Sequence, residues 1–194
     1  VKDSDALRNP GDDRIPDVVL GAKYAGDFGN VTLTMIGRQL RVDDGARSDE
    51  HYAGGASFAG RLYTFGRDNV RFTINGGTGL GRYLALGAVT GGYETQNDVL
   101  EGTLPSMSGH VAYQHHWSDH FRSSATFSFF QAFFPGDLLR EDVTEQAIGT
   151  YINLLYSPIP RTTFGIEGIH ARRELRDGRS GTLFRGQISA KFVL

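Results

Sequence analysis

The sequence predicts an all-β fold, an antiparallel transmembrane β-barrel with about nine strands. The main observation is a two-residue alternation of apolar and polar side chains, clearest in the last segment, TLFRGQISAKFVL at 182–194. Successive side chains of a β-strand point to opposite faces, so this segment has one apolar face and one polar face with two cations. An edge strand of a soluble antiparallel sheet shows the same alternation, so the segment alone leaves both alternatives open.

Composition also favours β-structure. The 194 residues include 26 Gly, 13 Phe and 8 Tyr but only 2 Met, a usage typical of strands joined by turns. No run approaches the ~20 apolar residues that a membrane helix needs. The mean hydropathy of -0.30 is compatible with a barrel, because only alternate residues of a barrel strand meet lipid.

Net charge and cysteine content exclude several classes of partner and site. The net charge is -2, which gives no reason to expect nucleic acid as a partner. The absence of cysteine excludes a disulfide framework, cysteine metal sites and cysteine nucleophiles.

The chain divides into a polar N-terminal loop, 1–16, and a single barrel domain, 17–194. The first segment is rich in Asp but lacks the spacing of a calcium-binding loop. The barrel domain contains nine alternating segments, which we expect to be strands. They are 18–25, 31–38, 52–62, 70–75, 107–117, 121–129, 148–157, 163–167 and 182–194.

The connections between these segments alternate between short and long. Short turns are expected at 27–30, 65–69, 118–120 and 157–161, and longer polar connections at 42–51, 76–106, 135–145 and 176–181. Bacterial outer-membrane barrels have short turns at one end and long loops at the other, whereas a soluble sandwich has no reason to sort its loops. Aromatic residues beside the short turns fit an interfacial girdle. They are Phe28, Phe65, Trp117, Phe121 and Tyr156.

The face opposite the apolar one is strongly basic although the whole chain is slightly acidic. Its acids are Glu167 and, near a turn, Asp27. Its cations are Lys23, Arg38, Arg61, Arg71, Arg122, Arg173, Arg185 and Lys191. One interpretation is a solvated face of mixed charge; the other is a water-filled lumen that favours anions, for which rings of Arg or Lys are the usual device.

The cost of an arginine in lipid supports this division of faces. A lipid-facing Arg costs about 2–4 kcal/mol at the membrane midplane and less near the strand ends. Arg172 and Arg173 could therefore exchange roles near their strand end.

The long connection 76–106 shows no clean period, and long loops in compact domains are usually functional. If it folds into the lumen, Arg82 and Tyr83 would narrow the pore; otherwise Arg82 is an exposed loop cation.

Motifs for other chemistries are weak. The glycines at 77, 79 and 81 lack the spacing of a nucleotide-binding loop. Parity places His115 on the face opposite His110 and His116, so a metal site is not expected. A Ser/His pair on the barrel wall, as in a membrane-embedded hydrolase, is conceivable but has no motif.

Several stretches resemble the C-terminal half of the DcaP-like porins of Gram-negative outer membranes. They are HVAYQHHWSDHFRSS, YINLLYSPIPRTTFGIEGIHARRELRDG, FRGQISAKFVL and, in the long loop, GLGRYL. The resemblance implies a homotrimer of 16-stranded barrels in the bacterial outer membrane, in contact with lipid and lipopolysaccharide. It also implies passage of small anionic organic acids, including dicarboxylates, and no cofactor. The lumen arginines implied to hold the anions are Arg38, Arg61, Arg71, Arg82, Arg122 and Arg185.

The chain departs from this family pattern in two ways. It ends in Leu194 where outer-membrane proteins usually end in Phe, and about nine strands are too few and odd in number. We therefore expect a C-terminal fragment of a larger barrel, or else a small barrel of eight or ten strands. The leading hypothesis is a passive anion-preferring porin and not an enzyme. The alternatives are a narrow barrel with a structural or binding role and a membrane-embedded hydrolase.

Overall fold

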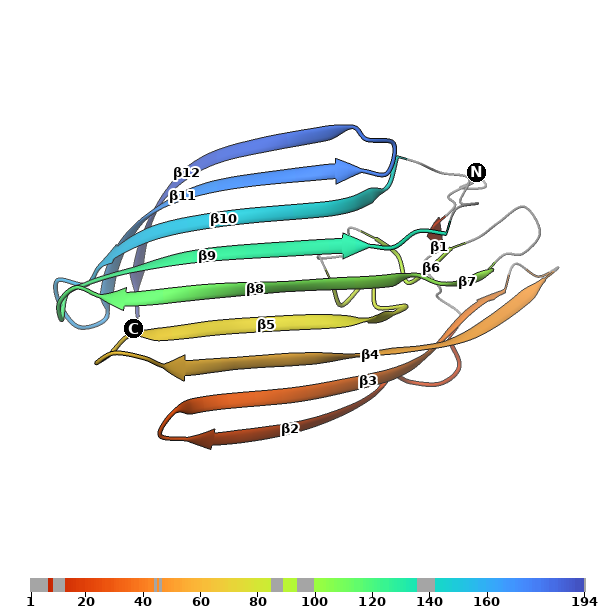
Figure 1. The fold of residues 1–194 in the computed structure, drawn as a ribbon, viewed down its shortest axis with the longest axis horizontal. Helices are drawn as coiled ribbons and strands as arrows, with labels where there is room; N and C mark the ends of the chain where they lie inside the picture. The colour runs from red at the N-terminus through yellow and green to blue at the C-terminus, as the bar shows by residue number, and fades with distance from the viewer. Residues whose placement is uncertain are drawn as a thin grey trace.

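The computed structural model describes residues 7–8, 13–43, 45, 47–84, 89–93, 100–135 and 142–193. Within them, one nine-stranded antiparallel sheet has the order β12-β11-β10-β9-β8-β5-β4-β3-β2 (Figure 1). Its strands are β2 (Val18–Gly26), β3 (Gly29–Asp43), β4 (Ser48–Tyr63), β5 (Asn69–Thr78), β8 (Pro105–His116), β9 (Phe121–Ala132), β10 (Thr144–Tyr156), β11 (Thr162–Leu175) and β12 (Ser180–Phe192). The nine expected strands are therefore all present, and most extend beyond their expected ends.

A second, small sheet has the order β1-β6-β7. It consists of β1 (Leu7–Arg8), β6 (Gly92–Tyr93) and β7 (Gly102–Thr103). β1 lies inside the segment expected to be a polar loop, and β6 and β7 lie inside the long connection 76–106. The structure thus joins these two segments, which the sequence pattern treats separately.

The sheet does not close on itself. Among the described residues, no strand pairs with the outer edge of β2 or of β12. Because every neighbouring pair is antiparallel, β2 and β12 run in the same direction, toward the end of the short turns (Figure 1). Antiparallel closure therefore takes further strands between these two edges.

Short turns gather at one end of the sheet, as the sequence predicts (Figure 1). The turn between β2 and β3 needs a glycine, because Gly29 has a φ of 126° and a Cβ there would lie 2.0 Å from the Arg61 carbonyl oxygen. At the other end, the connections 79–104 and 133–143 are long, whereas the expected long connection at 176–181 is a four-residue turn, 176–179. The predicted loop at 42–51 is wrong in extent, because β3 and β4 run through most of it.

A reversal of the alternation explains this longer hairpin. At the end of β3 far from the short turns, Leu40 and Val42 face inward and are buried, whereas Arg41 faces outward opposite Glu50. In this part of β3 and β4 the apolar side chains therefore point inward, where the long connection covers Leu40 and Val42. A prediction that expects outward apolar residues along the whole of β3 and β4 therefore makes both strands too short.

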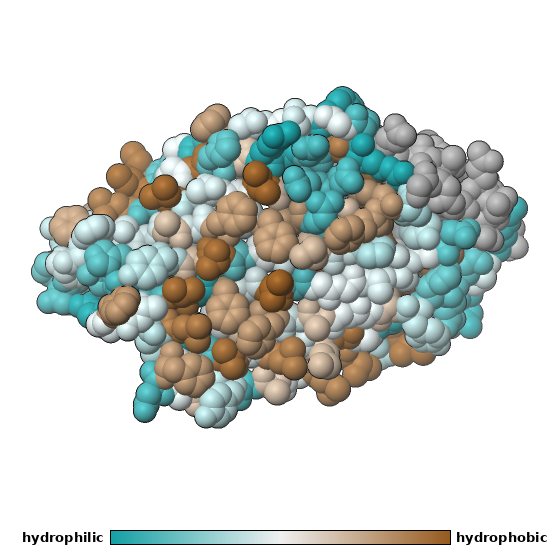
Figure 2. Space-filling view, viewed as in Figure 1, coloured by the Kyte–Doolittle hydropathy of each residue, from teal (hydrophilic) through white to brown (hydrophobic). Residues whose placement is uncertain are grey.

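The outer face carries a continuous apolar belt. Figure 2 shows hydrophobic residues gathered over the middle of this face, with polar residues toward the ends of the sheet. Its exposed members include Leu20, Met35, Phe58, Ile74, Val111, Phe127, Ile152, Ile166 and Ile188. Among the described residues, there is no helix of the length and hydropathy needed to cross a membrane.

We expect an arginine on the outer face to destabilise the barrel far more than one on the inner face. Val111→Arg should lower the free energy of unfolding in lipid vesicles by about 2–4 kcal/mol, the cost of Arg in the hydrocarbon region. Thr126→Arg, on the inner face one position along the neighbouring strand, is the control and should cause a small change. Equal losses from urea titration would contradict the assignment of the faces.

Candidate functional site

The inner face of the sheet is hollow over β8 to β12. A cavity of about 800 Å³ lies there. The inward side chains that line it include Asn75, His110, Ser128, Tyr151, Arg173 and Leu183. The lining of this cavity is mostly apolar, with Phe130, Ala147 and Leu175 beside these polar side chains and Arg173 at the rim.

The long connection between β5 and β8 packs onto the inner face. Leu80, Leu84 and Val89 form a buried cluster with Phe130 and Ala132 of β9. A second cluster joins Leu40 and Val42 of β3 to Leu100. The described parts of this connection therefore narrow the inner space at the end opposite the short turns. The sequence alone left open whether the connection folds inward.

A network around Asp17 fastens this connection to the sheet. Asp17 accepts hydrogen bonds from Tyr83 and from Arg82 Nη2, the latter at 2.6 Å. Its other oxygen lies 3.4 Å from Arg38 Nε, and Arg38 Nη1 donates to the Gly79 carbonyl at 3.0 Å. One carboxylate therefore ties the start of β2, strand β3 and the inward connection together.

The environment of Asp17 keeps it ionised. Burial acts to raise its pKa, but hydrogen bonds from Tyr83 and Arg82 and the charges of Arg38 and Arg82 outweigh burial and lower the pKa. Arg38 is also within 3.5 Å of Asp13 and has only 6 % of its surface exposed. Arg38 and Arg82, both predicted to hold anions, thus hold protein carboxylates in this structure.

Other predicted cations gather near the short-turn end of the inner face. We call this group the basic belt, and its members are Lys23, Arg61, Arg71, Arg122 and Lys191. Within the described part of the chain, no carboxylate forms an ion pair with any of them. Arg122 instead donates to the Ser157 hydroxyl at 3.1 Å. Among the described residues, these charges therefore have no carboxylate partner.

The two remaining predicted cations lie apart from the basic belt. Arg185 is exposed opposite Ile169 near the middle of β12, and Arg173 is exposed opposite Gly181 near the other end. Arg172 faces outward and pairs with Glu174 at 3.0 Å. The structure therefore does not bring all nine predicted residues into one site.

Acidic residues concentrate at the end opposite the basic belt. Besides Asp13 and Asp17, Asp49 on the inner face accepts a hydrogen bond from the Leu100 amide at 3.2 Å. Near the short turns, Glu167 lies 3.4 Å from Asn153 Nδ2. The inner face is thus mostly basic at one end and carries buried or paired acids at the other.

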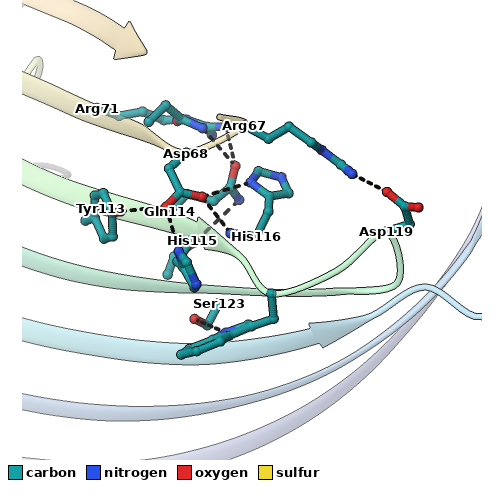
Figure 3. Close-up of polar contacts among 12 residues, drawn as sticks. Arg67, Asp68, Arg71, Tyr113, Gln114, His115, His116, Asp119 and Ser123 are labelled. Atoms are coloured by element: carbon teal, nitrogen blue, oxygen red, sulfur yellow. Dashed lines mark hydrogen bonds and ion pairs between the residues drawn. The ribbon is translucent and has the colours of Figure 1, made fainter. Parts of the chain in front are cut away.

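A second carboxylate, Asp68, organises the short turn between β4 and β5 (Figure 3). It accepts hydrogen bonds from the Tyr113 hydroxyl at 2.6 Å and from the His116 amide at 2.8 Å, and it contacts His115 Nδ1 at 2.6 Å. The hydrogen bonds from Tyr113, His115 and His116 hold the pKa of Asp68 far below its ordinary value. Asp68 is 5 % exposed, so it fixes the turn onto β8.

Aromatic side chains surround this end of the outer face. The rings of Phe121 and Tyr156 stack at 4.5 Å, and Trp117 lies edge-on to His115 at 4.3 Å. All five residues predicted to form the girdle are exposed. Their position at the short-turn rim is the one expected for an interfacial girdle.

The three histidines considered for a metal site do not share one face of β8, because His110 and His116 have one parity and His115 the other. No group of three or more potential metal-ligating side chains is found among the described residues. His115 and His116 instead flank Asp68. Asp17 and Asp68 were missed from the sequence, because their partners are distant along the chain and only the strand register brings them together.

Comparison with known proteins supports the fold. No protein-family model matches the sequence, and no curated protein sequence does either. The crystal structure of the outer membrane channel DcaP of Acinetobacter baumannii is similar, with a TM-score of 0.78 and 16% sequence identity. The match covers 96% of this chain but 56% of the channel, so the chain spans little more than half of that protein's length. The predicted DcaP-like antiparallel barrel is thereby confirmed at the level of fold, with this chain matching part of one barrel.

We expect Asp17→Asn to loosen the inward connection. Loss of the carboxylate charge weakens the contacts of Arg82 and Arg38 at once, so amide hydrogen exchange in residues 79–84 should become faster. Asp27→Asn, at the opposite end of β2, is the control and should leave exchange there unchanged. Unchanged exchange in Asp17→Asn would mean that the buried leucines alone hold the connection.

Asp68 should make barrel stability depend on acid pH. Its folded pKa lies below the unfolded value, so its contribution is complete above about pH 4 and is lost as the pH falls toward its folded pKa. Asp68→Asn should lower the urea midpoint at pH 7 and flatten this acid dependence. Asp119→Asn, which removes the partner of exposed Arg67, should do neither.

Proposed function

We propose that this chain forms part of a porin in the outer membrane of a Gram-negative bacterium. Such a porin lets small anionic solutes, carboxylates among them, diffuse through a basic lumen. The observation that carries the proposal is the basic belt, which lies on the inner face of a sheet whose outer face is an exposed apolar belt. Cations that form no ion pair with a described carboxylate, on a low-dielectric wall beside water, raise the local concentration of anions.

The likeness to an outer membrane channel supports the membrane and transport parts of this proposal. The apolar belt and its aromatic rim fit a sheet surrounded by lipid, with lipopolysaccharide at the far end. The inward connection would leave a constriction rather than a closed core, because the 800 Å³ cavity lies beside it. Passive diffusion then needs no catalytic residue, and the protein would act as a channel rather than an enzyme.

Assembly as a homotrimer belongs to the same proposal, by analogy with the porins that the motifs resemble. Molecular mass measured in detergent tests it directly. A monomer at all concentrations would contradict the trimer and leave the channel proposal in place.

Planar-bilayer recording of the full-length protein that contains this chain tests the channel. In a salt gradient, we expect a conductance with a reversal potential on the anion-selective side. A folded protein without conductance would favour a narrow barrel with a structural or binding role. A cation-selective reversal potential would contradict the anion preference but not the channel itself.

Charge reversal in the basic belt should reduce the anion preference. Arg71→Glu combined with Arg122→Glu replaces two positive charges by two negative ones, and the anion-to-cation permeability ratio should fall by roughly threefold or more. Arg161→Glu with Arg172→Glu makes the same net change away from the inner face and is the control. An equal effect of both pairs would mean that overall charge, not the lumen wall, sets the selectivity.

A further inference from the structure

One part of the basic belt is built differently from the rest. Near the short turn between β4 and β5, the inner face has a hollow of about 470 Å³. Three arginines and a histidine meet around it, together with three uncharged polar side chains and a glycine. The lining residues are Arg61, Arg67, Arg71, His116, Tyr63, Asn69, Gln114 and Gly66.

Two of the arginines face each other across neighbouring strands. Arg61 of β4 is the register partner of Arg71 of β5, and both side chains point inward. Like charges directly opposite in an antiparallel pair repel each other and destabilise the sheet. The next residue in the row is Ala112 of β8, whose small side chain leaves space beside Arg71.

Uncharged acceptors orient one of these guanidinium groups. Arg71 Nε donates to Asn69 Oδ1 at 2.9 Å, and Arg71 Nη2 donates to Gln114 Oε1 at 3.1 Å. Asn69 is 4 % exposed, and its amide nitrogen lies 3.4 Å from the same Gln114 oxygen. Arg71 is therefore held in place without losing its charge to a carboxylate.

The nearby carboxylates, Asp68 and Asp119, contact other groups than Arg61 and Arg71. Asp68 accepts hydrogen bonds from Tyr113 and the His116 amide and contacts His115 (Figure 3). It also lies 3.7 Å from Nδ1 of His116, so, among the described residues, the histidine of the hollow has a carboxylate beside it and the two inner arginines do not. Asp119 pairs with Arg67 at the rim of the hollow. Within the part of the chain that the structure describes, no ion pair with a carboxylate reaches Arg61 or Arg71.

We infer that this hollow is a binding site for a phosphate group, either free or carried as a monoester by a small molecule. A tetrahedral dianion can accept hydrogen bonds from two guanidinium groups at once and match both charges, whereas a single carboxylate offers two oxygens and one charge. The attraction of a bound dianion to both guanidinium groups would offset the repulsion between Arg61 and Arg71. The inference rests on the proposed function in one respect, that the inner face meets water.

Calorimetric titration of the full-length protein in detergent with inorganic phosphate tests the site, in a chloride buffer. We expect saturable binding of one phosphate per chain. Arg61→Gln and Arg71→Gln should each weaken it roughly tenfold or more, the usual effect of losing charge-assisted hydrogen bonds. Arg71→Lys keeps the charge but loses the planar fork, so it should weaken binding less than Arg71→Gln.

Arg122→Gln is the matched control, because it removes another cation of the basic belt outside the hollow. Its phosphate affinity should stay within about twofold of the parent value, as expected for a charge that makes no direct contact. Equal weakening by Arg122→Gln, or no saturable binding by the parent protein, would overturn the site. Unchanged circular dichroism spectra would establish that each variant has folded.

Competing ligands identify the chemistry. Tighter binding of glycerol phosphate than of phosphate would support the site and indicate a monoester as its source, and equal binding would support free phosphate. Succinate or acetate binding as tightly as phosphate would overturn the assignment. So would binding confined to vesicles of phosphatidic acid, because a lipid headgroup does not reach the inner face.

The bilayer recordings keep this inference separate from the proposed function. Anion-selective conductance without phosphate binding would contradict the phosphate site and support the porin. Phosphate binding that depends on Arg61 and Arg71, in a protein without conductance, would keep the site and remove the channel.

Discussion

Backbone hydrogen bonding in hydrocarbon is the constraint on which the rest of this structure depends. Every backbone polar group surrounded by lipid needs a partner within the protein, and an antiparallel ladder supplies one for each inner strand. Among the described residues, the two edge strands, β2 and β12, have a hydrogen-bonded neighbour on one side only, and they run in the same direction. An all-antiparallel barrel then needs an odd number of further strands between them, which agrees with a chain that covers 56% of the solved channel.

Once the ladder is set, strand parity decides where each side chain goes. A one-residue slip would exchange the two faces, moving Arg71 and Arg122 into lipid and Phe72 into water. The sorting also reverses along the axis, because at the far end Leu40 and Val42 turn inward under the connection. Here the covering segment, and not the membrane, provides the apolar environment. The same sheet therefore has two apolar environments, lipid on its outer face and a protein layer on part of its inner face.

Much of this architecture could be predicted from the sequence, since parity and tight turns are local signals. The nine strands and the inward basic face follow from alternation alone. The neighbouring positions of Arg61 and Arg71 could also have been found, because the two residues are symmetric about Gly66 in the turn. The extents of β3 and β4 could not, because their upper halves break the outward-apolar rule. Nor could the positions of Asp17 and Asp68, since contacts over 45 residues or more depend on register and on how the long connection packs.

The uneven placement of charge along the inner face has an electrical consequence. Cations that pair with no described carboxylate lie near the short turns, whereas Asp13 and Asp17 are joined to Arg38 and Arg82 at the other end. In the channel that we propose, an anion entering from one side meets the attractive region first, and from the other side meets the constriction first. Ions would accumulate in the pore at one polarity of the applied voltage and be depleted at the other. The open channel would therefore rectify, passing more current in one direction, with no moving part.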